Sequence, residues 1–510
     1  MPNKILRLVL GDQLNLQHSW YRKKDSEISY VLMEVMQEQE YVMHHVQKIL
    51  GFFAAMRNFA AQLRKKGHHV IYIALDEKEN KQAVDANVLS LLKSGDFDRF
   101  EYQLPDEYRM DELLKALARK SGVKTAHTDT EHFLTTRDEV GDFFAGKKQF
   151  LMENFYRHMR QKHDVLMQRN DPQGKRWNFD EENRKKYDGK VPLPDAKAFD
   201  HDVSALKKMI DTKGVKYFGE VDEKHFSWPL SRREALSSLR YFCENLLPHF
   251  GTYEDALVKE HASLFHSRLS FALNTKMISP AEVIGAAVDA WQSHRKTISM
   301  AQIEGFVRQI LGWREFMRGV YWAHMPGFAK ENFFGHQRTL PKWFWDGKTK
   351  MNCLGNAIGN SLKNGWAHHI QRLMVIGNFA LLAGCDPDEV DEWYLGVYID
   401  AIQWVEITNT RGMSQFADGG IVATKPYVSS AAYIHKMSDY CENCFYDYRK
   451  KTGEKACPYN SLYWNFLDAN AKKLENNPRI GMVYKTWAKM KNRHELLEQA
   501  GKYLAEIDDL

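Results

Sequence analysis

The feature that most constrains this chain is a change in hydrophobic periodicity partway along it. In the first 135 residues, short apolar runs alternate with helix-period segments; the runs are Ile5–Leu10, Tyr30–Glu34, Val70–Leu75 and Phe100–Gln103. Such alternation predicts an α/β domain with a doubly wound parallel sheet. Ligands of such sheets bind beyond the carboxyl ends of the strands.

Polar residues follow several of these predicted strands. Gly11-Asp12-Gln13, Glu34 and Pro105-Asp106-Glu107 occupy strand ends, where a pocket could hold a planar cofactor. Ordinary strand-to-helix turns and caps explain the same residues, since polar turn residues are expected there in any case.

From about residue 200 onward the apolar residues recur with a helical period. Between Ile303 and Tyr321 they form one stripe, which comprises Phe306, Val307, Ile310, Leu311, Phe316, Met317 and Val320. This pattern predicts a large, mostly helical domain over residues 201–510. Residues 136–200 are polar, charged and poor in periodicity, so we interpret them as an interdomain connector between that domain and the α/β domain of residues 1–135. Their basic side chains could contact phosphates, although a solvated linker explains them too.

Bulk properties narrow the class of protein. A chain of 510 residues is longer than one hydrophobic core usually accommodates, which predicts more than one domain. Its 13 Trp, 23 Tyr and 28 Phe are enough to line a cofactor site. A net charge of +5 permits nucleic acid as a partner without demanding it. The chain has no run of 18 apolar residues, so we expect a cytoplasmic protein that does not enter a membrane.

The cysteines give the first specific signal. Cys441 and Cys444 form a CxxC pair, Cys457 follows before a proline, and Cys353 lies far upstream. Four such thiolates can bind one zinc ion or a [4Fe–4S] cluster, and spacing alone does not separate these two readings. The remaining interpretation is that these four cysteines are buried in the core and bind no metal.

A second signal is a group of polar and aromatic residues at helical spacing. His368 and His369 lie four and three residues before Arg372, so either histidine can share a helix face with the arginine. A histidine held beside a cation is a candidate proton donor, although such pairs are often simply hydrogen-bonded core residues. Farther along, residues 400–420 are dense in carboxylates, amides and glycines. Helical periodicity fails near Thr408, and a polar loop there suits contacts to ribose, phosphate or a heteroaromatic ring.

Several long motifs in one order carry a family resemblance. They are LGDQL, EVMQEQEYVMHH, RWNFDEENR, EGFVRQILGWREFMRG, NGWAHHIQRLM, GNFALLAG, TNTRGMSQFADGG, TKPY, MSDYCENC and ACPYN. Together they resemble the photolyase and cryptochrome superfamily, specifically its bacterial iron–sulfur branch, the prokaryotic (6-4) photolyases. The resemblance covers the whole chain.

The resemblance implies light-driven repair of (6-4) pyrimidine photoproducts in DNA by an electron from photoexcited reduced FAD. The residues that match the FAD site are His266, Ser267, Leu269, Ser270, Gln309, Trp313, Arg314, Arg372, Asp400, Glu406 and Asn409. Either Glu406 or Asn409 is expected to face flavin N5. His369, with His368, Tyr427 and Tyr433, matches the lesion pocket, although helix-entry packing also explains the two tyrosines.

Further expectations follow from the same resemblance. Trp393, Tyr394 and Trp345 match an aromatic electron-transfer route, and Cys353, Cys441, Cys444 and Cys457 match the ligands of a [4Fe–4S] cluster. The amino-terminal domain is expected to hold 6,7-dimethyl-8-ribityllumazine as an antenna. Its candidate residues are Gly11, Asp12, Gln13, Leu14, Glu34, Tyr41, Ile49 and Glu107. The branch responds to divalent cations such as Mg²⁺, for which Asp180 is the candidate.

The partner implied by the family is UV-damaged DNA with the lesion flipped out of the duplex, and the family implies a monomer. Two other classes stay open at this point. A cryptochrome-like photoreceptor would keep the flavin, the cluster and the antenna but signal without repair. An iron–sulfur DNA-binding module similar to the primase large subunit would explain the cysteines and helices, but it leaves HSRLS, WREF and the amino-terminal sheet unexplained.

Overall fold

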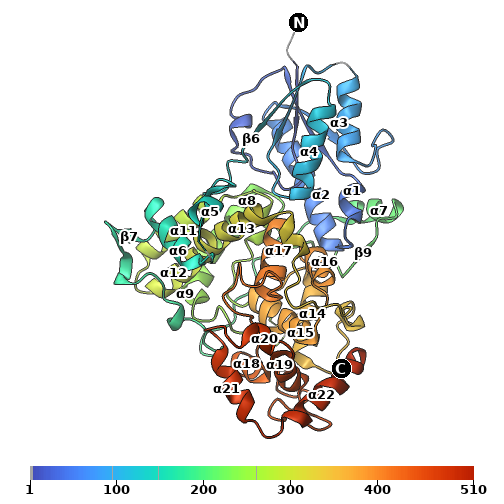
Figure 1. Cartoon of the computed structure of the whole chain (residues 1–510). Helices are drawn as coiled ribbons and strands as arrows, with labels where there is room; N and C mark the ends of the chain where they lie inside the picture. Colours follow the sequence, from blue (N-terminus) through green and yellow to red (C-terminus); the bar gives the residue numbers. More distant parts are fainter. Residues whose placement is uncertain (1–3, 95, 148, 260) are drawn as a thin grey trace.

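The computed structural model describes residues 4–94, 96–147, 149–259 and 261–510. An α/β layer at the amino-terminal end sits on a larger helical body, and the last helices, α19 to α22, lie at the opposite end (Figure 1). In the described residues, no helix is long and apolar enough to cross a bilayer.

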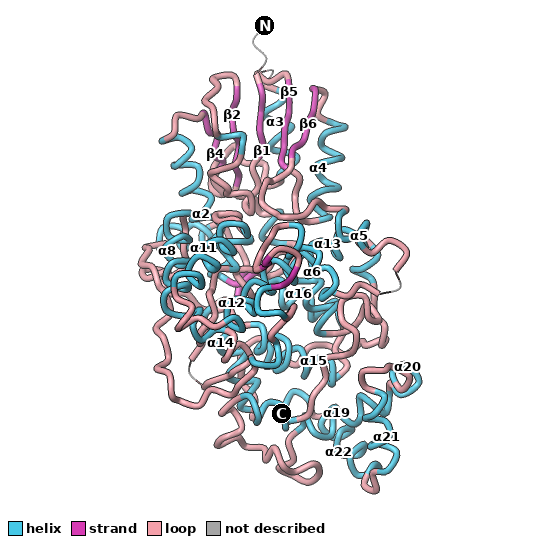
Figure 2. Tube along the Cα trace, turned by 90° about the vertical axis from the view of Figure 1, so that its left-hand side faces the viewer, coloured by secondary structure: helices cyan, strands magenta, loops and turns pink. Residues whose placement is uncertain are grey.

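The amino-terminal domain is built on a parallel sheet of five strands in the order β4-β2-β1-β5-β6. The strands are β1 Ile5–Leu8, β2 Ile28–Met33, β4 His69–Ile73, β5 Arg99–Gln103 and β6 Lys124–Thr128. Its helices are α1 Gln37–Glu40, α2 Val46–Lys65, α3 Val84–Lys93 and α4 Tyr108–Lys120. The predicted doubly wound sheet is confirmed, and Figure 2 shows its strands as a separate layer above the helical body.

Burial explains which strands the sequence predicts. Leu6, Val31 and Phe100 on the three inner strands are fully buried, so these strands read as apolar runs. Strand β6 lies at the sheet edge and consists of Lys-Thr-Ala-His-Thr, and none of its residues is fully buried. That exposure is why no apolar run predicts it.

The rest of the chain is mostly helical, as predicted, with only the short strands β7 Met167–Gln168, β8 Asp171–Pro172 and β9 Tyr217–Phe218 among its described residues; β9 pairs with β3 His44–His45. The helices of this part are α5 Glu139–Phe143, α6 Met152–Lys162, α7 Ser204–Thr212, α8 Arg232–Tyr241, α9 Leu247–Phe250, α10 Ser270–Asn274, α11 Pro280–Ser293, α12 Met300–Val307, α13 Glu315–His324, α14 Asn352–Asn364, α15 Asn378–Ala383, α16 Pro387–Val397, α17 Gln403–Ile407, α18 Ala431–Met437, α19 Pro458–Ala469, α20 Ala471–Leu474, α21 Gly481–Lys489 and α22 Arg493–Ala505. The predicted stripe from Phe306 to Val320 is buried along its whole length. Helices α5 and α6 fall inside the predicted connector, and Phe155 and Met159 of α6 are fully buried in the main core.

Four helical segments widen into π-helical turns, at Phe242–Leu246, Arg308–Arg314, Gln371–Gly377 and Thr408–Ser414. The chain therefore stays helical past Thr408, where the sequence predicts a loop. Two of these turns meet at Gly377: a Cβ there would lie 2.0 Å from Ser414 Oγ, so only glycine permits the approach. Such turns recur at functional sites.

A buried ionic cluster joins the two domains. Lys276 Nζ lies 2.8 Å from Asp12 Oδ2 and 2.8 Å from Asp106 Oδ2, while Arg318 Nε lies 3.3 Å from Asp106 Oδ1. Because one-sided removal of a buried pair leaves an uncompensated charge, this cluster fixes how the sheet domain sits on the helices.

His45 makes folding stability depend on pH. Its Nε2 donates to Leu362 O at 2.7 Å and its Nδ1 accepts from Gln47 N, so the native structure holds the neutral ring. Burial lowers the pKa of His45 to about 4. The unfolded chain therefore binds more protons between pH 6.5 and 4, and stability present above pH 6.5 is lost as the pH falls through this window.

We expect His45 alone to cost about 2 kcal/mol of stability at pH 5 relative to pH 7. H45Q keeps a donor and an acceptor without the titration. The fall in melting temperature from pH 7 to pH 5 should be smaller in H45Q than in the wild type, and an identical fall would contradict this assignment.

Candidate active site

A cavity of about 260 Å³ lies within the helical domain. Most of the residues that the sequence predicts for cofactor and lesion contacts line it; they are His266, Ser267, Leu269, Ser270, His368, His369, Arg372, Asp400, Glu406 and Asn409. Tyr394, predicted for electron transfer, lines it as well. These residues come from segments far apart in the chain, and the fold brings them together around one cavity.

A bidentate ion pair anchors one wall. Arg372 Nη1 and Nη2 donate to the two carboxylate oxygens of Asp400, each at 3.0 Å, and Ser270 Oγ donates to Asp400 Oδ2 at 2.6 Å. The guanidinium also lies 3.7 Å from the Tyr398 ring centroid. Although burial opposes the charge, Asp400 keeps the pKa of Arg372 above its ordinary value. The pair is therefore a fixed, charged feature of the wall.

Two buried polar atoms face the cavity without a partner among the described residues. His368 stacks on His266 at 4.6 Å, and its Nδ1 accepts and donates no hydrogen bond. Glu406 Oε1 likewise has no hydrogen-bond partner among the described residues. Burial raises the pKa of this carboxyl well above its ordinary value. Because unpaired buried groups are costly, these atoms mark where a polar ligand fits.

His369 is held as a neutral imidazole and not as a positively charged acid. Its ring is exposed to the cavity, yet the surrounding protein and Arg372 lower its pKa to about 4. The imidazole is therefore neutral at pH 7 and offers one N–H donor and one acceptor.

Three predicted cofactor residues lie behind the cavity lining. Gln309 Nε2 donates to Glu254 Oε1 at 2.7 Å, and Glu254 O in turn bonds His266 Nε2 at 3.1 Å. Arg314 bonds Asn274 Oδ1 at 3.2 Å, and Asn274 Nδ2 donates to Asp400 O at 2.7 Å. Gln309 and Arg314 thus support lining residues.

The third of these residues, Trp313, packs on Phe316. Tyr427 and Tyr433 also lie outside the cavity lining. Both are close to Asp255 and Arg184, and Tyr433 hydrogen-bonds to Asp255, so the two tyrosines form one neighbouring group.

Helix α16 carries the predicted electron-transfer pair. Asp386 caps the helix and Pro387 occupies its first turn, which sets the start of the segment. The rings of Trp393 and Tyr394 are 5.3 Å apart, and Tyr394 Oη donates to Arg372 O at 2.7 Å.

Trp345, the third predicted member, is 44% exposed and packs on Phe218. Its neighbour Phe344 contacts Trp393 at 5.3 Å. Tyr398 is a lining residue that the prediction missed; it lies four residues after Tyr394 and contacts it at 5.6 Å. Helical spacing is the signal that could have found it.

The four predicted metal-binding cysteines converge on a second, small cavity. Cys353 starts α14, Cys457 precedes α19, and Cys441 and Cys444 lie on the loop before it. All four line one cavity with Tyr440, Tyr446 and Tyr459. In the part of the chain that is described, no group of three or more His, Cys, Asp or Glu side chains has metal-binding geometry. Cys243 and Cys385 are buried and do not line this cavity.

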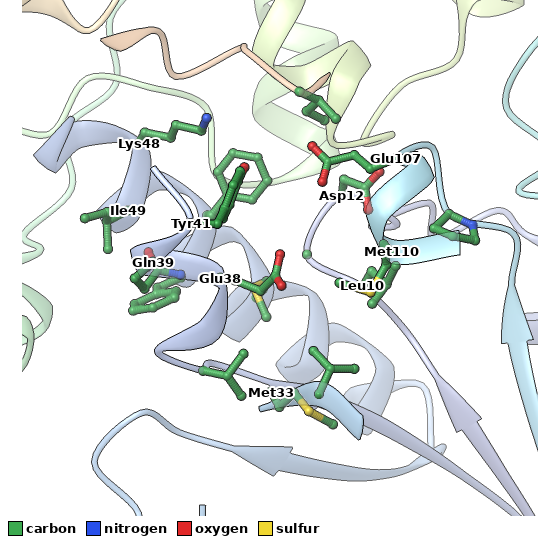
Figure 3. A pocket seen from close by; sticks show the side chains of 18 of the residues that line it. Leu10, Asp12, Met33, Glu38, Gln39, Tyr41, Lys48, Ile49, Glu107 and Met110 are labelled. Carbon is green, nitrogen blue, oxygen red and sulfur yellow. The ribbon is translucent and has the colours of Figure 1, made fainter. Parts of the chain in front are cut away.

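A third cavity, of about 140 Å³, opens at the carboxyl ends of the amino-terminal strands. Figure 3 shows Asp12, Tyr41, Ile49 and Glu107 around it, and Gly11 also lines it. The other predicted antenna residues, Gln13, Leu14 and Glu34, do not line this cavity. Gln13 Nε2 donates to Gln103 O, Leu14 N donates to Thr275 O, and Glu34 pairs with Arg57. Glu38, Lys48 and Met110 line the cavity without having been predicted (Figure 3).

The cavities of the two domains share one lining residue. Ala401 lines the cavity of the sheet domain and that of the helical domain, and it directly follows Asp400. The two cavities therefore approach each other at this residue.

Asp180, the candidate cation ligand, is paired with arginines. Its carboxylate contacts Arg184, and Arg308 Nη2 lies 3.1 Å away. These pairs neutralise the carboxylate within the protein.

Comparison with known proteins agrees with this arrangement. The chain is 41% identical over 509 residues to the "(6-4) photolyase" of Agrobacterium fabrum, with 99% of both chains covered. Residues 7–226 match the family model for deoxyribodipyrimidine photo-lyase-related protein.

Two solved structures share the fold. A bacterial class III photolyase from Agrobacterium tumefaciens superposes with a TM-score of 0.58 at 15% identity, covering 96% of this chain and 98% of its own. The cryptochrome of Synechocystis sp. gives 0.56 at 12% identity, with 98% and 99% covered. On the strength of the full-length match, the chain belongs to the photolyase and cryptochrome superfamily, in the branch of the bacterial (6-4) photolyases.

Proposed function

We propose that this protein repairs (6-4) pyrimidine photoproducts in DNA, using light absorbed by reduced FAD to deliver an electron to the lesion. The observation that carries this proposal is the 41% identity over the whole chain to a (6-4) photolyase. A photoreceptor without repair has no comparable support, because the cryptochrome match is 12% identical and shows the fold alone.

The residues of the cavity in the helical domain fit FAD. Arg372 and Asp400 would orient the polar part of the ligand, while His368 Nδ1 and Glu406 Oε1 supply the unpaired buried polar atoms that a heteroaromatic ring needs. Arg268 lines the same cavity, and burial lowers its pKa to about 10. It has no carboxylate partner among the described residues, so its charge suits a diphosphate.

His369, Tyr427 and Tyr433 are the proposed lesion contacts. The neutral imidazole of His369 can donate a proton from its N–H while it accepts at its other nitrogen. The two tyrosines lie near Asp255, outside the cavity lining, and we propose that they hold the flipped-out base pair.

Two further cofactors form part of the proposal. The four cysteines, surrounded by tyrosines, suit a [4Fe–4S] cluster, whose ligands are thiolates. The cavity of the sheet domain suits 6,7-dimethyl-8-ribityllumazine, because apolar side chains flank carboxylates that can bind a polar heterocycle. The wall shared at Ala401 would keep this antenna close to the flavin.

The proposal includes three further features. We propose UV-damaged DNA as the partner and a monomer as the working state. Asp180 is the candidate for Mg²⁺, and a cation there would have to displace Arg184 and Arg308.

Removing the positive charge of the Arg372–Asp400 pair should weaken the binding of FAD. We expect R372M to lower the affinity for FAD by at least tenfold, because Asp400 is left buried without its partner. The measurement is FAD retained per protein after dialysis. R338M, which removes an arginine that bonds only backbone oxygens outside the cavity, is the control and should keep its FAD. Equal retention in R372M and wild type would contradict the role of the pair.

Lesion choice tests the proposed function. The reduced protein is illuminated with an equal mixture of duplexes that carry a (6-4) product or a cyclobutane dimer, and products are separated by chromatography. Preferential loss of the (6-4) product supports the proposal. Preferential loss of the cyclobutane dimer, or binding without loss of either lesion, would overturn it.

A further inference from the structure

Positive charge is concentrated in one exposed segment near the carboxyl end. Residues 471–493 hold seven basic side chains and one acidic one, Glu475, which gives a net charge of +6. The whole chain has a net charge of +5, so all other residues together are slightly negative. The basic residues are Lys472, Lys473, Arg479, Lys485, Lys489, Lys491 and Arg493, and all seven are exposed. We call them the α21 patch.

These cations are not neutralised within the protein. Among the described residues, none of the seven forms an ion pair with a carboxylate; Lys473 donates to Phe333 O and Arg493 lies over the Trp487 ring. Unpaired exposed cations at this density are the electrostatic mark of a phosphate-binding surface.

Helix α21 holds part of the patch in a fixed array. Met482, Lys485 and Lys489 follow at spacings of three and four residues, so they share one face, and Met482 is 71% exposed. Trp487 points the other way: it is buried, stacks on Trp464 at 5.2 Å and donates to Asp468 Oδ1 at 2.7 Å. The exposed face is thus set by packing of the opposite face.

The segment that carries the patch contacts the chain just before Tyr427, one of the proposed lesion contacts. Asn477 Nδ2, within the segment, donates to Thr424 O at 3.1 Å. Thr424 precedes Tyr427 by three residues, a span of at most about 11 Å. Near this tyrosine the carboxylates of Asp180 and Asp255 both pair with Arg184, so their charges are offset within the protein, in contrast to the cations of the α21 patch.

We propose that the α21 patch binds the phosphate backbone of the duplex that flanks the lesion. This inference rests on the proposed function, since it assigns to the same reaction a second contact with its DNA. Phosphate contacts position a duplex and carry no sequence or lesion information, so the patch would raise affinity for damaged and undamaged DNA alike.

The test is charge reversal in the full-length, flavin-loaded protein. K485E/K489E should bind an undamaged duplex at least tenfold more weakly, and the slope of log affinity against log salt should shrink by up to about 2, or about 0.9 per lost phosphate contact. The ratio of affinities for (6-4) and undamaged duplex should not change. K485Q/K489Q should show a smaller loss in the same direction.

K93E/K120E is the matched control. It makes the same charge change at the ends of α3 and α4, at the opposite end of the molecule from α21 (Figure 1). It should bind DNA like the wild type. Equal weakening in both double variants, or wild-type affinity of K485E/K489E for undamaged duplex, would overturn the inference. A wild type that binds undamaged duplex but shows no preference for the lesion would instead contradict the proposed function.

Discussion

Replacement of His369 by alanine should abolish repair of a (6-4) duplex while the purified protein keeps its full FAD content. The imidazole faces the cavity and makes no hydrogen bond to the described residues of the wall, so its loss leaves the Arg372–Asp400 pair intact. A positioned proton donor contributes about 10²- to 10⁴-fold to a rate, and we expect a loss in this range.

The measurement is the initial rate of lesion conversion under continuous blue light, with FAD per protein determined on the same sample. H435A serves as the matched control, because His435 stacks on Tyr448 at 3.7 Å outside the cavity. It should repair at the wild-type rate. An H369A protein with full FAD and an unchanged rate would remove His369 from the mechanism.

Replacement of Cys441 by serine should have the second large effect. The loop between α18 and α19 carries three of the four converging cysteines, and Cys353 at the start of α14 supplies the fourth. Because the free energy of metal binding is also folding free energy, loss of one ligand removes support from this loop and from the helices beside it. We expect a low yield of soluble protein without the broad absorbance of a cluster.

C243A is the control for this variant. Cys243 is buried outside the cysteine cavity, so the substitution removes one thiol without touching the proposed ligands. It should give normal yield and the full cluster absorbance. A C441S protein with wild-type yield, iron content and activity would rule out a structural cluster at this site.

The sequence predicts the fold well because its signals are local. Apolar runs such as Tyr30–Glu34 and the stripe from Phe306 to Val320 reflect burial directly, and both are confirmed. Strand β6 lacks that signal because it is an exposed edge strand. The turn at Thr408–Ser414 is missed because a π-helical turn breaks the period of 3.6 without ending the helix.

The candidate site is only partly predictable for a different reason. Motifs identify segments, but the side that each residue presents depends on tertiary packing. Gln309 and Arg314 lie in a matching motif, yet neither lines the cavity; the structure directs Gln309 to Glu254 and Arg314 to the lining residue Asn274. In the sheet domain, Glu34 follows a buried strand as predicted, but Arg57 captures its carboxylate and turns it away from the cavity.

The most direct test of the account is a repair assay in light and in darkness. The purified protein, with its flavin chemically reduced, is mixed with excess duplex that carries one (6-4) product, and parallel samples are kept dark or illuminated with blue light. We predict restoration of the intact pyrimidines in the illuminated sample only, with more than one turnover per protein. Tight binding of the lesion without light-dependent restoration would contradict the account and would instead support a photoreceptor.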